Sequence, residues 1–312
     1  MRLVSLGRIF SANKQSQWMN SYAQVPRAIL LEDVIRIYFA TRGLPDEAGQ
    51  YTSRVGYVDV DKCLPTKIVS IAEHPVLDVG ESGSFDEFGV MPGEISQIGS
   101  ELRMLYTGWA RPPGMPYQTW IGEARSDLRG SHFERVSQYP VLGATPEESI
   151  LCNGPFTISH RGSDHMFYSS GLRWIDSQPS PECQYVIMHA QCSPGGEWLR
   201  DGVGSIPILH EMECQNAPTV HYKDGRFHML FCHRHALDFR NPERGYRLGY
   251  AWSDDLVCWH RNDEKLVLSG MRSHWDNEMQ CYPGFFRIRN EVFVLYCGNY
   301  FGKSGFGIAT VD

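Results

Sequence analysis

Several acidic residues recur at one level of a repeated sequence pattern, where they could carry out acid–base chemistry. The position five residues before each of five regularly spaced prolines holds a carboxylate in three repeats, Glu87, Glu213 and Glu278, and Asp86 adjoins the first. Carboxylates that share a cavity shift one another's pKa, so that one donates a proton while another accepts one. Cleavage of a glycosidic bond requires this division of roles. We therefore expect Glu213, Asp86, Glu278 and Glu87 to supply the catalytic groups.

A second set of basic, amide and aromatic side chains follows the same repeat and could bind a substrate. Nearly every repeat offers an arginine or lysine after its second expected strand, often with an aromatic neighbour. Aromatic faces stack on sugar rings, whereas arginine and amide groups bind hydroxyls or an anionic group. The expected substrate-binding residues are Asn20, Gln24, Arg42, Trp109, Arg111, Asn153, Arg173, Asn216, His233, Arg234, His235, Tyr282, Asn299 and Lys303.

Histidine and cysteine spacing does not indicate a metal site. His233 and His235 alternate along an extended segment, so both can face one side, but a structural pair explains that spacing more simply than metal ligation. The nine cysteines show no CxxC spacing. We expect them to be reduced thiols of a cytoplasmic protein, and we expect no metal and no other cofactor.

These residues must be positioned by a repeated β-structure. The five prolines are Pro26, Pro92, Pro155, Pro218 and Pro283, spaced 63 to 66 residues apart, and we number the repeats by them. Residues 211–235 show the unit most clearly, because two apolar segments flank a turn at residues 223–225 and therefore predict a β-hairpin. A third strand with small residues follows, and then a short fourth strand, expected at residues 74–77, 139–142, 206–209 and 265–268.

Five repeats of four antiparallel strands predict an all-β fold, a five-bladed β-propeller. The fifth repeat reaches Asp312 directly after its third strand. Residues 1–10 align without a gap with residues 133–142, so we expect the N-terminal strand to pair in the last blade and close the ring. The whole chain, residues 1–312, would then be a single domain. The prolines should lie on an edge strand or at a strand start, because proline cannot donate to a ladder.

Composition limits the partners. The 312 residues carry a net charge of −7, which argues against nucleic acid as a partner. No apolar run is long enough to span a membrane, and the N-terminus lacks a signal-peptide pattern. We expect a carbohydrate substrate, no nucleic acid and no membrane, and the sequence leaves the oligomeric state open.

Short motifs resemble those of the five-bladed β-propeller glycosidases, which include glycoside hydrolase families 32 and 43 and the mannoside phosphorylases. Residues 18–22, Trp-Met-Asn-Ser-Tyr, look like the Trp-Met-Asn-Asp-Pro start of the invertase group, and Glu213-Cys214 is similar to its Glu-Cys motif. The resemblance implies that Glu213 is the proton donor. The family's first-blade Asp, its nucleophile or base, is Ser21 here, so either the base has moved to Asp86, Glu87 or Glu278, or the chemistry differs.

Three functions remain open at this stage. The first is a glycoside hydrolase with carboxylate acid–base catalysis, for which inversion is favoured because the first-blade Asp is absent. The second is a phosphorylase or other glycosyl-transferring enzyme, in which Arg42, Arg111, Arg173 or Arg234 binds phosphate. The third is a sugar-binding propeller without catalysis.

Overall fold

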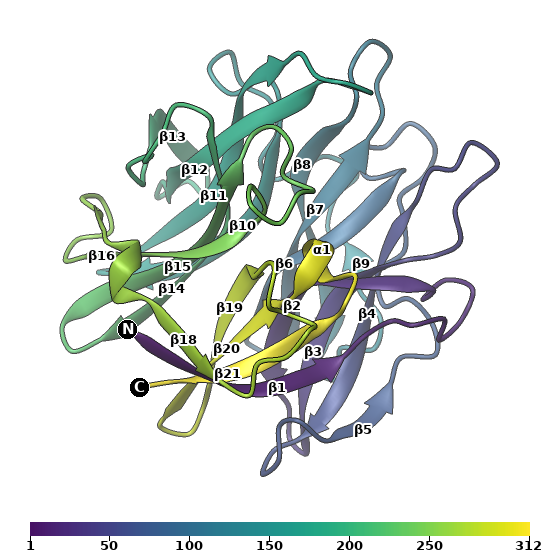
Figure 1. The fold of residues 1–312 in the computed structure, drawn as a ribbon. Coiled ribbons are helices and arrows are strands. Elements are labelled where there is room, and N and C mark those ends of the chain that lie inside the picture. The colour runs from purple at the N-terminus through teal and green to yellow at the C-terminus, as the bar shows by residue number, and fades with distance from the viewer.

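The computed structural model describes residues 1–312, which are almost entirely strand and loop (Figure 1). Its only helices are the 3-10 turn η1 (Asp263–Lys265) and the single turn α1 (Asn299–Gly302). Neither helix has the length and apolar character needed to cross a membrane. The fold is therefore all-β, as the repeated strand pattern predicts.

The strands form five mainly antiparallel groups that follow the five sequence repeats. The first group runs in the order β2 (Ser21–Leu30), β3 (Val34–Arg42), β4 (Ser53–Asp61) and β5 (Ile68–Ile71). The second group runs β6 (Gly89–Ile98), β7 (Glu101–Ala110), β8 (Gln118–Asp127) and β9 (Glu134–Arg135). One parallel pair, Ser53 with Gly89, joins these two groups into a single sheet.

The other three groups are separate sheets. The third contains β10 (Cys152–His160), β11 (Ser163–Ile175), β12 (Glu182–Cys192) and β13 (Trp198–Gly204). The fourth contains β14 (Glu213–Lys223), β15 (Arg226–His235), β16 (Arg247–Ser253) and β17 (His260–Arg261). The fifth runs in the order β18 (Val267–Gly270), β1 (Arg2–Phe10), β21 (Phe306–Val311), β20 (Glu291–Cys297) and β19 (Cys281–Ile288).

The N-terminal strand belongs to the fifth sheet. In β1, Leu3 lies opposite Val311 and Phe10 opposite Phe306, so β1 pairs antiparallel with β21. Figure 1 shows the purple β1 beside the yellow β21, with the two chain termini on the same side of the molecule. The predicted pairing of residues 1–10 with the last repeat is confirmed.

The predicted fourth strands were wrong in position. The fourth strands of the first four repeats are β5, β9, β13 and β17, each of which precedes the expected segment. In the first two repeats the expected apolar segments make only isolated bridges, Val55 with Leu77 and Ile121 with Leu142. The segment expected at residues 265–268 contributes to β18, which pairs in parallel with β1 of the fifth sheet. The apolar residues of these segments suggested strands because they are buried against the sheets. The segments themselves form few of the hydrogen bonds that pair one strand with another.

Every repeated proline lies beside an irregularity in its strand pairing. The register shifts between the innermost strand and its neighbour at 24/27, 92/94, 153/156, 216/219 and 281/284. Because proline has no N–H to give, it is tolerated at such a bulge. The strands β2, β10, β14 and β19 are also sheet edges, which confirms the predicted edge position for four repeats.

The apolar core lies between successive sheets. One buried cluster contains Tyr38 and Tyr106, another contains Met166 and Leu105, and similar clusters connect the third group to the fourth and the fourth to the fifth. The largest cluster joins the fifth sheet to the first group. The rings of Phe10, Phe39 and Phe306 meet there, with centroids 5.0 to 6.0 Å apart. Each group thus packs against the next, and the fifth packs against the first.

Candidate active site

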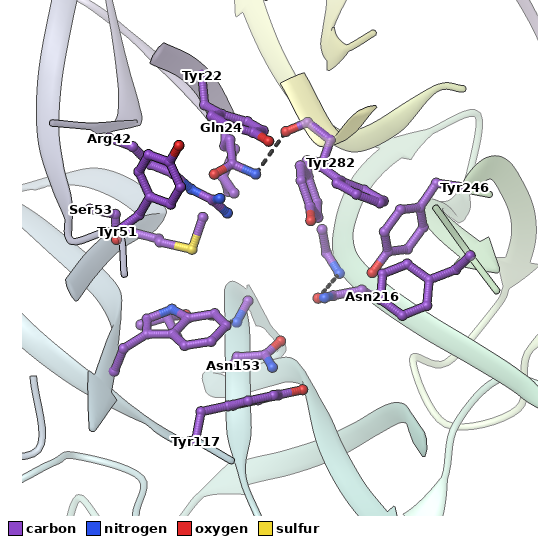
Figure 2. Close-up of a pocket in the computed structure, with 18 of the residues that line it drawn as sticks. Tyr22, Gln24, Arg42, Tyr51, Ser53, Tyr117, Asn153, Asn216, Tyr246 and Tyr282 are labelled. Carbon is purple, nitrogen blue, oxygen red and sulfur yellow. Dashed lines mark hydrogen bonds between the residues drawn. The ribbon is translucent and has the colours of Figure 1, made fainter. Parts of the chain in front are cut away.

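A cavity of about 710 Å³ lies where the innermost strands and the loops after the second strands come together (Figure 2). Its lining comes from all five groups, including β2, β6, β10, β14 and β19. The volume is within the range of pockets that hold a small-molecule ligand. The repeated structure therefore positions this site, because the equivalent segments of all five repeats meet around one cavity.

The floor of the pocket is formed at the proline bulges. The residue before each repeated proline lines the pocket, namely Val25, Met91, Gly154, Ala217 and Tyr282. All except Met91 have a positive φ, which is 52° to 53° at the three non-glycine residues and 61° at the glycine. Such left-handed conformations are costly for residues with a side chain and concentrate at functional sites. The bulge turns the strand so that its backbone edges the cavity.

Amide groups occupy the next position along the floor. Two residues before the proline stand Gln24, Asn153 and Asn216, and all three line the pocket. The Gln24 Nε2 donates to the Phe301 carbonyl at 2.7 Å, and the Asn216 Oδ1 accepts from the Ser169 hydroxyl at 3.0 Å. Figure 2 shows the three amides around the same cavity. Fixed amides of this kind are suited to binding hydroxyl groups.

Aromatic side chains form the walls. Figure 2 shows Tyr22, Tyr51, Tyr117, Tyr246 and Tyr282 around the cavity. The Tyr117 ring packs on an indole, Trp109, with centroids 5.0 Å apart. Burial raises the pKa of Tyr246 to about 12 and that of Tyr282 well above its usual range, so both hydroxyls stay protonated. The walls thus offer ring faces for stacking and neutral hydroxyls for hydrogen bonding.

Arg234 is the most enclosed cation of the pocket. Its residue is 4% exposed, and its guanidinium lies 3.5 Å from the centroid of the Phe239 ring. The Nε donates to the Tyr185 hydroxyl at 3.1 Å, and Nη1 donates to the next two backbone carbonyls. The Tyr246 hydroxyl also lies close enough to interact with the guanidinium through a hydrogen bond, and no carboxylate forms a salt bridge with Arg234. A buried guanidinium without a counter-ion is expensive unless an anion completes it.

Three further cations at the pocket lack a carboxylate partner. The Arg42 guanidinium lies 4.2 Å from the Tyr22 ring centroid, and the Arg111 guanidinium lies 4.6 Å from that of Phe88. Arg111 also donates to a backbone carbonyl at 3.0 Å. Neither arginine forms a salt bridge, nor does Lys303. Stacking holds the two arginines in place while leaving their charge uncompensated.

A fifth cation lies beneath the floor. Arg27 follows the first repeated proline and is fully enclosed, with its guanidinium donating to the carbonyls of Gly93, Pro26 and Pro283 at 2.5 to 3.0 Å. Burial lowers the pKa of Arg27 to about 10, which still leaves it charged near neutral pH. Its Nη2 is buried without a partner. This charge adds to the positive potential of the pocket.

One carboxylate lines the pocket. Glu182, the first residue of β12, accepts a hydrogen bond at 2.8 Å on Oε1 from Nη1 of Arg240, another lining residue. The Glu182 side chain is 13% exposed and the Arg240 side chain is 68% exposed. The pocket therefore has four unpaired cations on its walls, one ion pair, and no second carboxylate.

Two proteins of known sequence are similar to this chain over nearly its whole length. No family model matches the sequence. "Uncharacterized protein MT1551" and "Uncharacterized protein Rv1502", from the CDC 1551 / Oshkosh and ATCC 25618 / H37Rv strains of Mycobacterium tuberculosis, are each 32% identical over 309 residues. The match covers 98% of this chain and 98% of each relative. The chain belongs to their family.

Solved structures resemble this chain in fold. A structure described as "Glycoside hydrolase" aligns with a TM-score of 0.74 at 15% identity, over 99% of this chain and 90% of the other. A structure from a study of "the GH130 family of mannoside phosphorylases" aligns at 0.73 and 14%, over 99% and 93%. A structure of "a thermostable family-43 glycoside hydrolase" aligns at 0.66 and 16%, over 94% and 88%. The resemblance to propeller glycosidases is thus confirmed at the level of the fold.

The expected placement of Glu213 at the pocket is wrong. Its residue is fully buried, and it is absent from the pocket lining. Oε1 accepts from Arg261 at 2.5 Å and from Gln215 at 2.9 Å, while Oε2 accepts from the Leu209 backbone N–H at 3.0 Å. Arg261 and Gln215 lie within the fourth repeat, and Leu209 lies in the segment that leads into it. Glu213 therefore acts as a buried ion-pair partner that holds the sheet together.

Asp86 has the same kind of environment in the second repeat. Its Oδ2 accepts from the Arg135 Nε at 2.7 Å and from the Tyr106 hydroxyl at 2.9 Å, and the residue is 1% exposed. It too is absent from the pocket lining. Equivalent pairs recur in the third and fifth repeats, between Glu148 and Arg200 and between Asp276 and Arg272. A feature repeated in four of five repeats points to a structural role.

Glu87 and Glu278 also lie outside the pocket lining. Glu87 accepts from the Gly83 backbone N–H and the Ser82 hydroxyl in an exposed turn. Glu278 lies beside the lining residue Tyr300, whose pKa it raises through its charge and a hydrogen bond. The expectation that these carboxylates share one cavity is therefore not met.

The expected binding residues divide into two sets. Nine of them line the pocket: Gln24, Arg42, Trp109, Arg111, Asn153, Asn216, Arg234, Tyr282 and Lys303. The other five do not line it: Asn20, Arg173, His233, His235 and Asn299. The last set includes His233 and His235, which flank Arg234 and so point to the other face of β15.

Structural contacts account for four of the five misplaced residues. Arg173 donates to the Gln184 side chain at 2.9 Å. His233 lies 3.5 Å from a carboxylate oxygen of Asp263, and His235 contacts a neighbouring backbone carbonyl. The Asn299 side chain accepts hydrogen bonds from the backbone N–H groups of Glu278 and Met279 and donates one to the His274 carbonyl. For Asn20 the structure records two backbone hydrogen bonds and none from its side chain.

Sequence reasoning missed most of the aromatic walls and the single ion pair. The overlooked lining residues include Tyr22, Tyr51, Phe88, Tyr117, Glu182, Tyr185, Phe239, Arg240, Tyr246, Tyr300 and Phe301. Many lie in the long loops between second and third strands, whose length differs from repeat to repeat. The available signal was the number of aromatic residues in those loops, since loops of this length carry function more often than packing.

Proposed function

We propose that the protein is a carbohydrate-active enzyme that transfers a glycosyl group to or from a phosphate-type anion in this pocket. The observation that carries the proposal is the cluster of cations without carboxylate partners, above all the buried Arg234, which has no counter-ion. A guanidinium binds phosphate oxygens through charge-assisted hydrogen bonds. The likeness of the fold to glycoside hydrolases and mannoside phosphorylases supports a sugar as the transferred group.

The rest of the pocket suits a sugar. The ring faces of Tyr22, Tyr117 and Trp109 offer stacking surfaces, and the amides of Asn153 and Asn216 offer hydrogen bonds to hydroxyls. The anion would lie near Arg234, above the enclosed charge of Arg27. A sugar and an anion can then occupy one cavity of about 710 Å³ together.

Hydrolysis by a pair of carboxylates has little support from the geometry. That mechanism needs two carboxyl groups on either side of the scissile bond, whereas only Glu182 lines the pocket. An anionic leaving group or nucleophile removes the need for the second carboxylate, because phosphate leaves without protonation and attacks without a base. A single displacement of this kind inverts the anomeric configuration, so we propose an inverting reaction.

We further propose that residues 1–312 form one domain, a five-bladed propeller whose ring is closed by β1. The five strand groups, the five interfaces between them and the pairing of β1 with β21 support this arrangement. It explains why one pocket draws residues from every repeat.

Calorimetric titration with inorganic phosphate tests the function, with two arginine variants as a matched pair. Arg234→Gln should weaken phosphate binding roughly 10- to 150-fold, because charge-assisted hydrogen bonds contribute about 1.5–3 kcal/mol. Arg173→Gln removes a charge that lies outside the pocket, so the affinity should stay unchanged. Equal affinity in wild type and Arg234→Gln, or sugar cleavage that proceeds equally without phosphate, would overturn the proposal.

A further inference from the structure

Glu182 is held by one oxygen and leaves the other available. Oε1 accepts from Arg240, while Oε2 has no hydrogen-bond partner and is not enclosed by the protein. The two residues before it, Ser180 and Pro181, also line the pocket. The loop before β12 therefore carries the carboxylate to the edge of the cavity with its free oxygen open to a ligand.

No other lining side chain is suited to accept a proton. The pocket lining contains neither histidine nor cysteine. Burial raises the pKa of Tyr117 far above neutral and that of Tyr246 to about 12, so these phenols remain protonated. The remaining charged groups are cations. Glu182 is thus the one group in the pocket that can take a proton from a sugar hydroxyl near neutral pH.

We infer that Glu182 is the catalytic residue that exchanges this proton, an inference that rests on the glycosyl transfer proposed above. In the synthetic direction, the acceptor hydroxyl oxygen attacks the anomeric carbon and its proton passes to Glu182 Oε2. The bond from the anomeric carbon to the phosphate oxygen breaks, and phosphate leaves with the electron pair. In the reverse direction, phosphate attacks and protonated Glu182 gives its proton to the departing sugar oxygen.

Arg240 acts as the positioning residue for Glu182. The hydrogen bond from Arg240 Nη1 to Glu182 Oε1 at 2.8 Å fixes the direction of the carboxyl group and leaves Oε2 to exchange the proton. Arg240 has no second carboxylate partner, and its guanidinium lies 4.4 Å from the Phe239 ring centroid. The other titratable groups whose charges reach Glu182 are Tyr117, Cys183 and Cys214. Burial raises the pKa of each of these groups, so they stay neutral near neutral pH.

The test compares Glu182→Gln with Glu197→Gln, an exposed glutamate of the loop that follows β12. The probes are inorganic phosphate for binding, and hexose 1-phosphates of both anomeric forms with sugar acceptors for turnover. Glu182→Gln should keep phosphate affinity and the unfolding midpoint while kcat falls ~10²–10⁴-fold. The Glu197→Gln protein should match wild type in both measurements.

Two further readouts separate catalysis from a structural role. Added formate should restore part of the rate of Glu182→Ala, because a small carboxylate can occupy the vacated space, and should not accelerate wild type. The acid limb of the pH–rate profile should disappear in Glu182→Gln. Arg240→Gln should lower kcat and leave the phosphate affinity unchanged, because Glu182 then loses the hydrogen bond that fixes its direction.

The outcomes distinguish this inference from the function on which it rests. Phosphate-dependent transfer that survives Glu182→Gln at the wild-type rate overturns the role of Glu182 and leaves the function standing. Phosphate-independent turnover that is lost in Glu182→Gln keeps the role of Glu182 and overturns the function. A wild-type protein that turns over none of the probes overturns both.

Discussion

Buried carboxylate–arginine pairs are a recurring structural device of this molecule. Asp86, Glu148, Glu213 and Asp276 each meet an arginine of the same repeat. In three repeats a tyrosine of the second strand also donates to the carboxylate, at 2.9 to 3.0 Å. The pairs satisfy charges that would otherwise be costly inside the protein, so breaking one should affect folding rather than the reaction.

Replacement of Glu213 tests that distinction. In Glu213→Gln the buried Arg261 loses one of its two carboxylate partners, and the free energy of unfolding should fall by about 3 kcal/mol. Turnover per folded molecule should stay at the wild-type value, because the residue does not line the pocket. Glu211→Gln, two positions earlier with its side chain 85% exposed, should not change the urea midpoint. A stable Glu213→Gln protein with lost turnover would contradict this assignment.

The direction of individual side chains explains which site residues the sequence predicted correctly. Along β14, Glu213 and Asn216 are three positions apart, so they point to opposite faces of the strand. Counting five residues back from the proline therefore selected a carboxylate on one face of the strand. The amide that lines the pocket, two residues before the proline, lies on the opposite face. The recurrence of Tyr106, Tyr168 and Tyr296 in equivalent second strands was a sequence signal for the structural role of their carboxylate partners.

Among the strands, the bulge at each repeated proline turns the backbone of the innermost strand toward the cavity, so that this backbone forms the floor of the pocket. Gly154 shows the constraint most directly, with φ at +61° in β10. A Cβ added there would lie 2.9 Å from Asn216 Oδ1. That oxygen is already fixed by the Ser169 hydroxyl and the Ala217 backbone N–H. The neighbouring amide therefore has little room to give way.

Two glycine variants separate backbone strain from this contact. Gly162→Ala, at φ +80° in the turn after the same strand, adds a Cβ that meets nothing within 4 Å, so it should cost only about 1–2 kcal/mol for the left-handed backbone. Gly154→Ala should cost more, because it adds the contact with Asn216, and it should also weaken sugar binding. Urea unfolding and calorimetry measure the two effects. Equal losses of unfolding free energy in both variants would show that the Asn216 side chain moves away from the added Cβ at no cost.

Element boundaries were predicted best where the repeat itself supplied the evidence. The innermost and second strands lie where the proline period indicates, because turn residues and alternation define a hairpin locally. The fourth strands were misplaced, since a short outer strand such as β9 or β17 has two residues and little hydrophobic pattern. The pocket loops vary from repeat to repeat, and no period predicts where Glu182 or Tyr117 will lie.

At the scale of the whole molecule, β1 connects the two ends of the chain. It lies between β18 and β21, and it contributes Leu3, Ile9 and Phe10 to buried clusters. Leu3 packs with residues of the fourth and fifth sheets, whereas Phe10 packs with the first group. A single strand therefore contacts three of the five groups, and its loss should reduce the stability of all three.

Deletion of residues 1–10 should destabilise the entire protein. Three buried apolar side chains at about 2–3 kcal/mol each are lost with the strand, and the edges of β18 and β21 are left unpaired. The melting temperature should fall by roughly 10 °C or more. A synthetic peptide of residues 1–10 should restore it by filling the vacant position, whereas the same peptide with Leu3→Asp should not, because Leu3 is fully buried. An unchanged melting temperature after deletion would show that the other sheets hold together without β1, and the proposed ring closure would then contribute nothing to stability.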